Sequence, residues 1–595
     1  MNVIGFKEAK CRNCYKCVRT CNVKAIMVKD EQAQIMNDKC ILCGQCLEAC
    51  PQNAKTLISD LDKVKSFLKD GIPTVVSIAP SYLGLLKYKT RGQVVTALKK
   101  LGFSMIRETS EGAAFVTDEY EKLLTAGTMD NIITTCCPSV NDLIEIYYPS
   151  LTGYMAPVVS PMIAHAKLIR REMGNNVKVV FLGPCIAKKR EAESDPRTAG
   201  LVDAVLNFTE VEEWLKEKCI DIKELEDSPF ENPNPMVNRL YPISSGVLSS
   251  IVASKNIPDR YRKFYVHGIE NCIELFKSME KGEVTGCFIE ADLCSGGCIK
   301  GPAVNDTSIS RFKVKLDMEE TIPKLPIEEA SFFERAQNIN FHKTFLDRSI
   351  KDTLPTEEQI NYILSKIGKI KPEDELNCGA CGYSSCREKA IAVFQGKAEL
   401  TMCIPYMHAK AQSMANVVLD MTPNVILLVD SDMKIVEFSG AAELYFHIPR
   451  AKATEMYLYE LIDHSDFEEV LTTHKAIMGK KVEYPDRGLT TLQNIVYVHE
   501  QNAVLGIFQD ITKEEENNKQ AYKVKVDTIE MAQKVIDKQM LVAQQIAGLL
   551  GETTAETKVT LTRLRDTILY DGKNDEKSSQ YPEGPPHYDR KSDNI

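Results

Sequence analysis

The sequence predicts a multidomain chain built around an α/β core, in which parallel sheets are covered by helices. Short apolar runs alternate with amphipathic segments from Lys69 onward, as expected for strands joined by crossover helices. Cysteines gather in three separate groups, and residues 414–515 contain none. A length of 595 residues, of which 44% are hydrophobic and 26% charged, is enough for several hydrophobic cores.

Charge and composition narrow the possible functions. The chain has 73 basic and 83 acidic residues, a net charge of −10, which argues against a general nucleic-acid-binding surface. It lacks an apolar run of about 18 residues, and Met1–Lys10 lacks the apolar stretch of a signal peptide, so we expect a cytoplasmic protein with no membrane contact. In that compartment its 20 cysteines should be reduced thiols or metal ligands.

Eight cysteines near the N-terminus form two copies of the spacing C-x2-C-x2-C-x3-C, and the second copy ends in Cys50-Pro51. All-thiolate sets with few histidines favour iron-sulfur clusters, with a pair of structural zinc sites as the alternative. Residues 1–57 resemble the bacterial two-cluster ferredoxins, so we predict an α+β ferredoxin-like domain over residues 1–60. The resemblance implies that the fourth thiolate of each run crosses over to the other 4Fe-4S cluster. One set would be Cys11, Cys14, Cys17 and Cys50, and the other Cys40, Cys43, Cys46 and Cys21.

Three predicted strands of the core run directly into cysteine-containing loops. Because ligands gather beyond the carboxyl ends of parallel strands, these loops should form one buried metal site. The expected strands are Thr74–Ala79, Asn131–Thr135, Val177–Leu182 and Val284–Ile289, and the last three of them precede the cysteines.

The loops TTCCPSV, GPCIAKKREAE and EADLCSGGCIKGP resemble the three signature loops of the FeFe hydrogenases, and SIAPSY at Ser77–Tyr82 resembles the loop that precedes them. The resemblance implies a hydrogenase-type domain over residues 70–345 that holds the H-cluster. The 4Fe-4S half of this cluster would be bound by Cys137, Cys185, Cys294 and Cys298. Cys298 would also bridge to a diiron half that carries carbon monoxide, cyanide and an azadithiolate.

The same resemblance assigns roles to three further residues. Lys188 would donate a hydrogen bond to a cyanide ligand, Ser81 would lie against the diiron unit, and Cys136 would pass protons between solvent and the azadithiolate amine. Two positions depart from the hydrogen-producing members, which have methionine there. Gly183 should leave space or water beside the diiron unit, and Asp292 should add a negative charge that affects catalysis, so fast turnover is in doubt.

An alternative for this domain is that it holds only an ordinary 4Fe-4S cluster, because insertion of the diiron half requires separate maturation proteins. Three cysteines stand outside every motif, and we interpret them as core residues: Cys219, Cys272 and Cys287.

A third cysteine set has the spacing C-x2-C-x4-C-x16-C and begins with the segment CGACGYSSC. It resembles the small 4Fe-4S domain of corrinoid proteins and redox subunits, so we predict a helical 4Fe-4S domain over residues 355–413. A four-cysteine zinc site is the alternative. The ligands would be Cys378, Cys381, Cys386 and Cys403.

The segment 414–515 resembles an α+β PAS domain, with expected strands at Asn424–Asp430, Lys434–Ser439, Gln493–His499 and Ala503–Asp510. PAS sheets bind haem, flavin or nothing, and we interpret His447, His464 and His474 as surface or core residues. Residues 516–570 are predicted to be a helical signalling or dimerisation region, although the helix could equally pack on its own PAS domain. Residues 571–595 are predicted to be disordered.

These features together favour a low-turnover hydrogenase that senses hydrogen or redox state, passing electrons through 4Fe-4S clusters and signalling through the PAS domain. The alternatives are a catalytic ferredoxin-linked hydrogenase and a non-enzymatic 4Fe-4S redox sensor that lacks the diiron half. No kinase, phosphatase or DNA-binding motif occurs, so the output would be a separate kinase or phosphatase. Other expected partners are hydrogen and protons, ferredoxin or another redox protein, the maturation proteins and a second copy of the chain.

Overall fold

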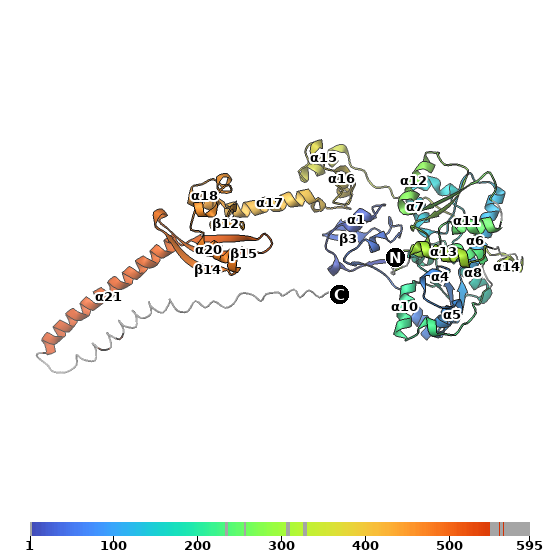
Figure 1. The fold of residues 1–595 in the computed structure, drawn as a ribbon, viewed down its shortest axis with the longest axis horizontal. Helices are drawn as coiled ribbons and strands as arrows, with labels where there is room; N and C mark the ends of the chain where they lie inside the picture. Colours follow the sequence, from blue (N-terminus) through green and yellow to red (C-terminus); the bar gives the residue numbers. More distant parts are fainter. Residues whose placement is uncertain are drawn as a thin grey trace. The chain divides into compact units, whose positions relative to one another are not determined.

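The computed structural model describes residues 3–232, 236–254, 257–304, 310–324 and 330–547, with residues 559 and 563. The chain divides into two compact units, residues 1–408 and 409–595 (Figure 1). The predicted disordered tail lies outside the described residues, as do residues 548–570 of the predicted helical region, apart from residues 559 and 563. None of the described helices combines the length and apolarity needed to cross a membrane.

The first domain of unit 1 consists of two short antiparallel strand pairs and two one-turn helices, as expected for an α+β ferredoxin-like domain. Both helices begin after a residue in the left-handed conformation, Tyr15 before α1 (Lys16–Thr20) and Gly44 before α2 (Gln45–Glu48). The strand pairs are β1 (Ile4–Phe6) with β4 (Lys55–Leu57), and β2 (Ile26–Lys29) with β3 (Gln32–Ile35).

The central domain contains two parallel sheets covered by helices, which confirms the predicted fold class. One sheet has the order β6-β5-β8-β9 and the other β10-β11-β7, and all their pairings are parallel. The strands are β5 (Thr74–Ile78), β6 (Met105–Glu108), β7 (Ile132–Ile133), β8 (Lys178–Leu182), β9 (Ala204–Leu206), β10 (Arg262–His267) and β11 (Cys287–Asp292). The main covering helices are α5 (Arg91–Lys100), α6 (Ser110–Ala126), α7 (Pro138–Tyr147), α8 (Pro161–Met173), α9 (Ala187–Glu193), α10 (Phe208–Glu217) and α12 (Ile269–Glu280).

One predicted strand is displaced. The strand expected at 284–289 begins three residues later, at Cys287, because Gly286 adopts φ +65° and still belongs to the preceding turn. As a result, Glu290 and Asp292 lie within the strand rather than in the loop that follows it. Strands β6, β9 and β10 were not predicted, because their short or charged segments lack a distinct apolar run.

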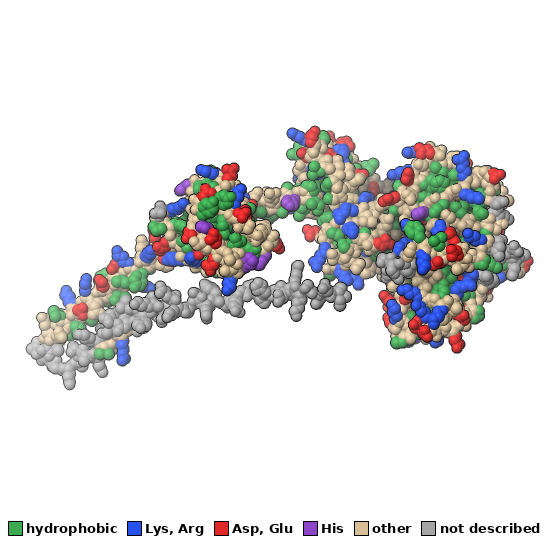
Figure 2. Space-filling view, in the orientation of Figure 1, with side chains coloured by type: hydrophobic (Ala, Val, Ile, Leu, Met, Phe, Trp, Pro, Cys, Tyr) green, Lys and Arg blue, Asp and Glu red, His purple; other side chains and the backbone are tan. Residues whose placement is uncertain are grey.

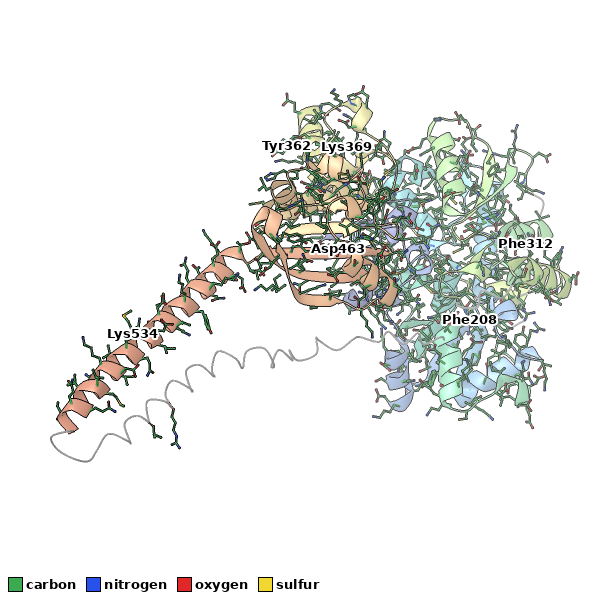
Figure 3. All side chains as sticks on the ribbon, turned by 60° about the vertical axis from the view of Figure 1, so that its left-hand side comes forward. Phe208, Phe312, Tyr362, Lys369, Asp463 and Lys534 are labelled. Atoms are coloured by element: carbon green, nitrogen blue, oxygen red, sulfur yellow. The ribbon has the colours of Figure 1, made fainter. Side chains whose placement is uncertain are left out.

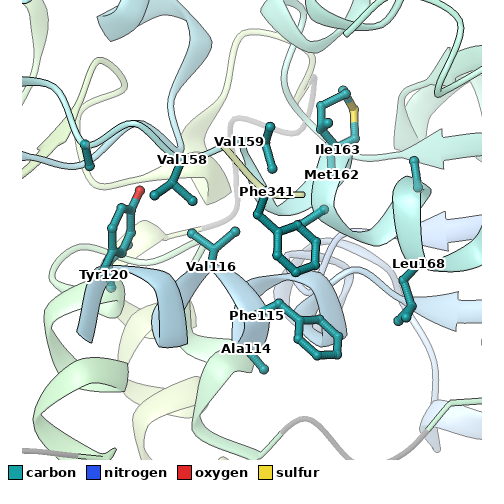
Figure 4. Packing of buried hydrophobic residues seen from close by; sticks show 14 of the residues in the cluster. Ala114, Phe115, Val116, Tyr120, Val158, Val159, Met162, Ile163, Leu168 and Phe341 are labelled. Atoms are coloured by element: carbon teal, nitrogen blue, oxygen red, sulfur yellow. The ribbon is translucent and has the colours of Figure 1, made fainter. Parts of the chain in front are cut away.

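Helices α6 and α8 pack together over an apolar core in which aromatic rings fill the space between elements (Figure 4). The Phe115 ring on α6 stacks on Phe341 with a centroid distance of 5.7 Å. Tyr120, further along α6, is fully buried and points its hydroxyl toward the end of β7, where Thr135 N donates to it at 2.9 Å. This core therefore fixes a polar group beside the cysteines that follow β7.

A buried ion network lies beneath the same helices. Glu111 on α6 is fully buried, and its Oε2 lies 2.9 Å from His165 Nε2 and accepts from Arg107 Nη2 at 2.6 Å. Its Oε1 accepts from Arg335 Nη1 at 2.5 Å. Burial opposes ionisation, but His165, Arg107 and Arg335 outweigh it and lower the pKa of Glu111 from 4.5 to about 2.

We expect Glu111→Gln to destabilise unit 1 at pH 6 and to lose this effect in acid. A carboxyl whose pKa is depressed in the folded state contributes stability above its ordinary pKa of 4.5, and the contribution disappears as the pH falls toward 2. The shift corresponds to about 3 kcal/mol in the free energy of unfolding. Urea denaturation of the cluster-free chain at several pH values measures this, with Glu283→Gln as an exposed control. A difference between Glu111→Gln and wild type that is constant from pH 6 to pH 2 would contradict it.

The last domain of unit 1 is small and helical, with α15 (Glu357–Lys366) and α16 (Cys386–Phe394). Each helix has a side-chain N-cap, from Thr356 and Ser385, whose hydroxyls accept backbone N–H groups. Tyr362 and Lys369 of this domain are labelled in Figure 3. Helix α17 (Ile404–Met421) starts directly after Cys403 and continues past the boundary at residue 408, so the predicted domain boundary at 413 falls inside a helix.

Unit 2 contains a five-stranded antiparallel sheet of order β13-β12-β16-β15-β14, consistent with a PAS fold. Its strands are β12 (Val425–Val429), β13 (Ile435–Phe438), β14 (Ile477–Tyr484), β15 (Leu489–Val498) and β16 (Ala503–Asp510). The helices α18 (Gly440–Phe446), α19 (Arg450–Ala453) and α20 (Ser465–Thr473) complete the domain. Strand β14 was not predicted because its exposed lysines and glutamate mask the alternation.

Two histidines of unit 2, His447 and His474, have structural positions at the ends of helices. His447 and His474 end helices in the left-handed conformation, at φ +55° and +56°, and the His474 ring stacks on Tyr497 at 3.9 Å. After the sheet, α21 (Thr512–Ala547) is a single 36-residue helix. Charged and apolar side chains are both exposed along it (Figure 2), and Lys534 marks its position in Figure 3.

Candidate metal centres and active-site cavity

The carboxyl ends of β7, β8 and β11 converge on one cavity of about 90 Å³, which we call the central cavity. Cys136 and Cys137 line it from the end of β7, Cys185 from the loop after β8, and Asp292 and Cys298 from β11 and its loop. A cavity of this size, lined by thiols and a few charged groups, has room for a non-protein group larger than a few waters. The three loops predicted from sequence are therefore brought together, although β8 belongs to a different sheet from β7 and β11.

Close backbone approaches hold these loops in place. Cys137 caps α7, whose first residue is Pro138, so the chain turns into the helix directly after the thiol. A Cβ on Gly297 would lie 2.5 Å from the Pro242 carbonyl oxygen, and one on Gly301 would lie 2.5 Å from the Pro184 carbonyl oxygen. Only glycine permits this packing of the third loop against Pro242 and against Pro184 of the second loop.

The four thiols predicted to bind the cluster share one electrostatic environment. Burial raises the pKa of Cys294 well above its ordinary value, and Cys137, Cys185 and Cys298 raise it further. Burial also raises the pKa of Cys137 to about 12, with added contributions from Asp292 and Cys185. Four half-buried thiols that raise one another's pKa become thiolates together most readily beside a strongly cationic group, so this donor set fits a 4Fe-4S cube.

Lys188 supplies a buried positive charge at the cavity wall. Its Nζ donates to Glu191 Oε2 at 2.7 Å and to the Cys136 carbonyl oxygen at 3.3 Å, and Glu191 Oε2 also accepts from Ser160 Oγ at 3.0 Å. Burial lowers the pKa of Lys188, but Glu191, Cys185 and Cys136 outweigh it and hold the pKa above its ordinary value. The ammonium is thus charged and fixed beside Cys185, where a polar ligand in the cavity would meet it.

Ser81 and Cys136 complete the polar part of the wall. Ser81 is fully buried and lines the cavity, and its Oγ has no hydrogen-bond partner among the described residues. An unsatisfied buried hydroxyl calls for a partner that the protein itself does not provide. The Cys136 thiol contacts Tyr120 Oη at 3.2 Å, and burial raises its pKa to about 12, so the sulfur carries a proton at neutral pH.

Two carboxyl groups on β11 lie beside these thiols, and only one of them was predicted. Burial raises the pKa of Asp292 above its ordinary value of 3.8, which favours the neutral form of this carboxyl. Glu290 is fully buried, and its Oε2 accepts from Leu248 N at 2.7 Å. Burial and Asp292 raise the pKa of Glu290 well above 4.5. Glu290 was not predicted as a site residue because the expected strand ended at residue 289. Its place in the alternating pattern of the strand is visible only when β11 extends to Asp292.

The expectation that Gly183 leaves empty space or water is wrong. A Cβ at this position would lie 2.7 Å from Phe181 Cε1 and 3.0 Å from Ala79 Cβ. The Phe181 ring lines the cavity in place of a side chain from residue 183. The volume that methionine would occupy is therefore filled by a phenylalanine two residues earlier on β8.

Gly183→Met is expected to lower the free energy of unfolding by about 1–3 kcal/mol, because it overpacks a filled site. Combining it with Phe181→Ala removes the clashing ring, so the double variant should be more stable than the sum of the two single effects predicts. Urea denaturation of the four chains in this cycle measures the coupling. Strict additivity would show that the ring and the new side chain do not compete for space.

The N-terminal domain forms a second thiol-lined cavity, of about 20 Å³, which we call the Cys21 pocket. Its thiols come from both cysteine runs, in the combination that the ferredoxin resemblance implies. They are Cys21, Cys40, Cys43 and Cys46. For the other predicted set, burial raises the pKa of Cys17, with smaller contributions from Cys11 and Cys14. The pKa of Cys50 is lowered against the effect of burial, chiefly by hydrogen bonds from backbone N–H groups such as that of Ala54. Among the described residues, no three His, Cys, Asp or Glu side chains surround a single-ion position.

The segment that forms the Cys21 pocket packs against helices α7 and α9, which follow two of the loops that line the central cavity. Ser139 Oγ on α7 donates to the Leu42 carbonyl oxygen at 3.3 Å, and Arg190 Nη1 on α9 donates to the Cys40 carbonyl oxygen at 2.7 Å. Cys185 contacts the same apolar cluster as Cys21. Clusters held at these two places would therefore be neighbours.

The third cysteine set lines a cavity of about 20 Å³ in the helical domain, and we call it the Cys378 pocket. Its thiols are Cys378, Cys381, Cys386 and Cys403. The same cavity is lined by Lys389, which sequence reasoning did not single out because a lysine on a short helix is usually exposed. The three isolated cysteines lie outside the pockets: Cys272 and Cys287 are buried in the core and Cys219 is exposed, so the interpretation of Cys219 as a core residue is wrong.

Comparison with known protein families agrees with this architecture. Residues 72–302 match the C-terminal domain of the iron-only hydrogenase large subunit. Residues 10–54 match a 4Fe-4S dicluster domain, residues 374–405 an Fe-S cluster domain, and residues 414–511 the PAS fold.

Similar proteins include two curated relatives and a solved structure. Iron hydrogenase 1 of Clostridium pasteurianum is 26% identical over 378 residues, which cover 47% of this chain and 66% of the relative, just under two thirds. The nuclear prelamin A recognition factor of Xenopus laevis is 23% identical, covering 50% of this chain and 81% of the relative. The FeFe-hydrogenase HydA1 from Chlamydomonas reinhardtii is 17% identical, covers 49% of this chain and all of that chain, and has a TM-score of 0.42.

The thiol-lined cavity at the strand ends lies inside the matched hydrogenase segment, and the other two pockets lie inside matched Fe-S segments. The chain is therefore homologous to the FeFe hydrogenases and joins the C-terminal domain of an iron-only hydrogenase large subunit to a 4Fe-4S dicluster domain, a further Fe-S domain and a PAS domain.

Proposed function

We propose that the chain reacts slowly with hydrogen and reports on hydrogen, or on cellular redox state, through its third Fe-S domain and its PAS domain. The observation that carries this proposal is the central cavity. It combines predicted ligand thiols with a fixed ammonium at Lys188, a thiol at Cys136 and an unsatisfied hydroxyl at Ser81. An ordinary 4Fe-4S cube needs only the four thiolates, whereas the remaining groups suit a further polar ligand.

Each residue would have a distinct task. The thiolates of Cys137, Cys185, Cys294 and Cys298 would hold the 4Fe-4S half. The diiron half, when bound, supplies the redox chemistry for heterolytic cleavage of hydrogen. Lys188 and Ser81 donate hydrogen bonds that fix the orientation of its polar ligands. Cys136 receives and releases the proton at its Sγ, and Tyr120 at 3.2 Å holds that thiol in place.

The sensory part of the proposal is supported by the way the domains are joined. Cys403, a predicted ligand in the Cys378 pocket, is the residue directly before α17, and α17 leads to the first strand of the PAS sheet. A change of charge at this pocket thus acts at the start of a continuous helix. Among the described residues of unit 2 there is no catalytic motif that would use an electron from the Cys378 pocket for another reaction.

Two alternative functions each have an observation in their favour. Retention of Cys136 at the cavity wall favours a catalytic ferredoxin-linked hydrogenase. Similarity to a relative named for recognition of prelamin A favours a non-enzymatic protein with 4Fe-4S cubes alone. Both alternatives use the same fold, so only the contents of the central cavity and the turnover rate separate them.

The test is an infrared spectrum of anaerobically purified chain, matured with the diiron precursor, before and after addition of hydrogen. Carbonyl and cyanide bands that shift with hydrogen, together with turnover far below that of a catalytic hydrogenase measured in parallel, are the expected result. Shifting bands with fast turnover would favour the catalytic alternative. Absence of bands in a chain that contains all its cubes would overturn the proposed hydrogen chemistry.

The same proposal includes self-association through α21. Val526, Ile529, Ile536 and Met540 follow a heptad spacing along this helix. A parallel pair would also place Lys525 of one copy opposite Glu530 of the other, in the g-to-e′ arrangement that favours parallel coiled coils. Sedimentation of the full chain should therefore show a dimer that Ile536→Glu dissociates, and a monomeric wild type would refute this pairing.

A further inference from the structure

Two buried lysines, Lys369 and Lys389, line the Cys378 pocket, and the function of Lys389 is not explained by folding alone. Lys389 on α16 has a relative exposure of 2%, and its Nζ donates to the Leu400 carbonyl oxygen at 2.9 Å. Burial lowers the pKa of Lys389, and the thiols of Cys403, Cys381 and Cys386 oppose this by favouring the charged form. The anionic groups that face this ammonium are thus the predicted cluster ligands themselves.

A buried ammonium is costly unless an anion lies close to it. A carbonyl oxygen satisfies one of its three N–H donors but does not neutralise its charge. A 4Fe-4S cube held by four thiolates carries a net negative charge that increases by one when the cube is reduced. A fixed cation in the same cavity therefore stabilises the reduced form more than the oxidised form.

The position of the pocket shows where an electron would come from. The loop that carries Cys381 is joined to the N-terminal domain by two hydrogen bonds. Arg19 Nη1 donates to the Ala380 carbonyl oxygen at 2.8 Å, and Lys24 Nζ donates to the Gly382 carbonyl oxygen at 2.6 Å. A third bond connects the backbones, from Val28 N to the Lys397 carbonyl oxygen at 2.9 Å.

Tyr383 lies where the helical 4Fe-4S domain meets the N-terminal domain, and it contacts residues of both. It lines the Cys378 pocket, and it also packs in the apolar cluster that contains Val18 and Cys21. Both Cys381 and Cys21 act electrostatically on its hydroxyl. A Cβ on Gly382 would lie 2.8 Å from Val18 Cγ1, so the two domains meet without a gap. Tyr383 therefore connects the wall of the Cys378 pocket to the apolar cluster around Cys21.

We infer that Lys389 sets the reduction potential of the cluster held in the Cys378 pocket, so that electrons arriving from the Cys21 pocket come to rest there, at the start of α17. The transfer is a one-electron exchange in which the neighbouring cube is oxidised and this cube reduced, with no bond formed or broken. The inference deepens the proposed sensory function, because it identifies the site at which the signal is stored. It depends on cluster assembly in both pockets but not on hydrogen chemistry in the central cavity.

The test is a dithionite titration of the full chain with all clusters assembled, followed by electron paramagnetic resonance. The signal of this cluster is identified as the one lost in Cys386→Ser. Lys389→Met removes the charge, Lys389→Arg retains it, and Lys366→Met removes an equal charge from the surface of the same domain. At a fixed ambient potential we expect Lys389→Met to lower the ratio of reduced to oxidised cluster about tenfold, a shift of about 59 mV for one electron.

Lys389→Arg and Lys366→Met should both remain close to wild type, and iron content should be equal in all chains. An unchanged ratio in Lys389→Met with full iron content would overturn the inference. If Lys389→Met lacks the cluster, Lys389→Gln repeats the measurement with a polar side chain. Loss of cluster iron in both neutral variants, with retention in Lys389→Arg, would also overturn it by assigning Lys389 to assembly. The infrared test of the central cavity is independent, so failure of one proposal leaves the other standing.

Discussion

Cys136→Ala is expected to lower hydrogen turnover at least a hundredfold, while the carbonyl and cyanide bands of the matured chain persist. The thiol lines the cavity and carries its proton at neutral pH, so it is placed to relay protons between the cavity and solvent. General acid-base groups in such positions contribute about 10²- to 10⁴-fold. Alanine leaves Tyr120 Oη, 3.2 Å from the thiol, without that contact and provides no group that can transfer a proton.

Hydrogen-deuterium exchange and dye-linked hydrogen oxidation measure this effect in the same preparation. Cys219→Ala is the matched control, because it removes an isolated and exposed cysteine. Undiminished turnover in Cys136→Ala would mean that protons reach the cavity by another route. Loss of the infrared bands would instead assign Cys136 a role in holding the cluster.

Lys188→Met is expected to destabilise the chain by about 3–5 kcal/mol, because it leaves the Glu191 carboxylate buried without its closest cation. Glu191 has a relative exposure of 3%, and its remaining partners are Ser160 Oγ at 3.0 Å and, more distantly, Lys343 Nζ at 3.7 Å. The double variant Lys188→Met/Glu191→Gln removes both charges and should recover much of this stability.

Urea denaturation of the cluster-free chain separates this structural effect from any effect on the bound group. Lys65→Met is a suitable control, because its partner Glu217 is exposed and such pairs contribute little. A second result is expected in the matured protein, where loss of the ammonium should shift the cyanide bands. Equal stability of Lys188→Met and wild type would show that Glu191 is not compensated by Lys188.

The predicted parts of the structure are those encoded locally. Apolar runs at Thr74–Ile78 and Lys178–Leu182 specify buried strands wherever they pack, and fixed cysteine spacings identify the loops that follow. Parallel pairing then requires those loops to meet at one edge of each sheet. The fold class and the grouping of thiols around the central cavity followed from these local signals.

The parts that could not be predicted depend on tertiary contacts. Phe181 fills the space beside Gly183 because of its orientation within β8, which a sequence pattern does not reveal. Glu290 and Lys389 are residue types that are usually exposed, and only the packing of β11 and α16 buries them. Each of these three residues lies beside a predicted metal centre, where local preference is overridden by the requirements of the site.

The packed junction between the segment that carries Cys381 and the N-terminal domain also constrains how the protein is assembled. Arg19 and Ala380 are 361 residues apart in sequence, so the N-terminal domain emerges from the ribosome long before the segment that covers it. During that interval the face around Val18 and Cys21 lacks its cover, and a cluster can be delivered to it from solution. Cluster loading should therefore proceed in order, with the N-terminal pocket filled before residues 378–403 close over its face.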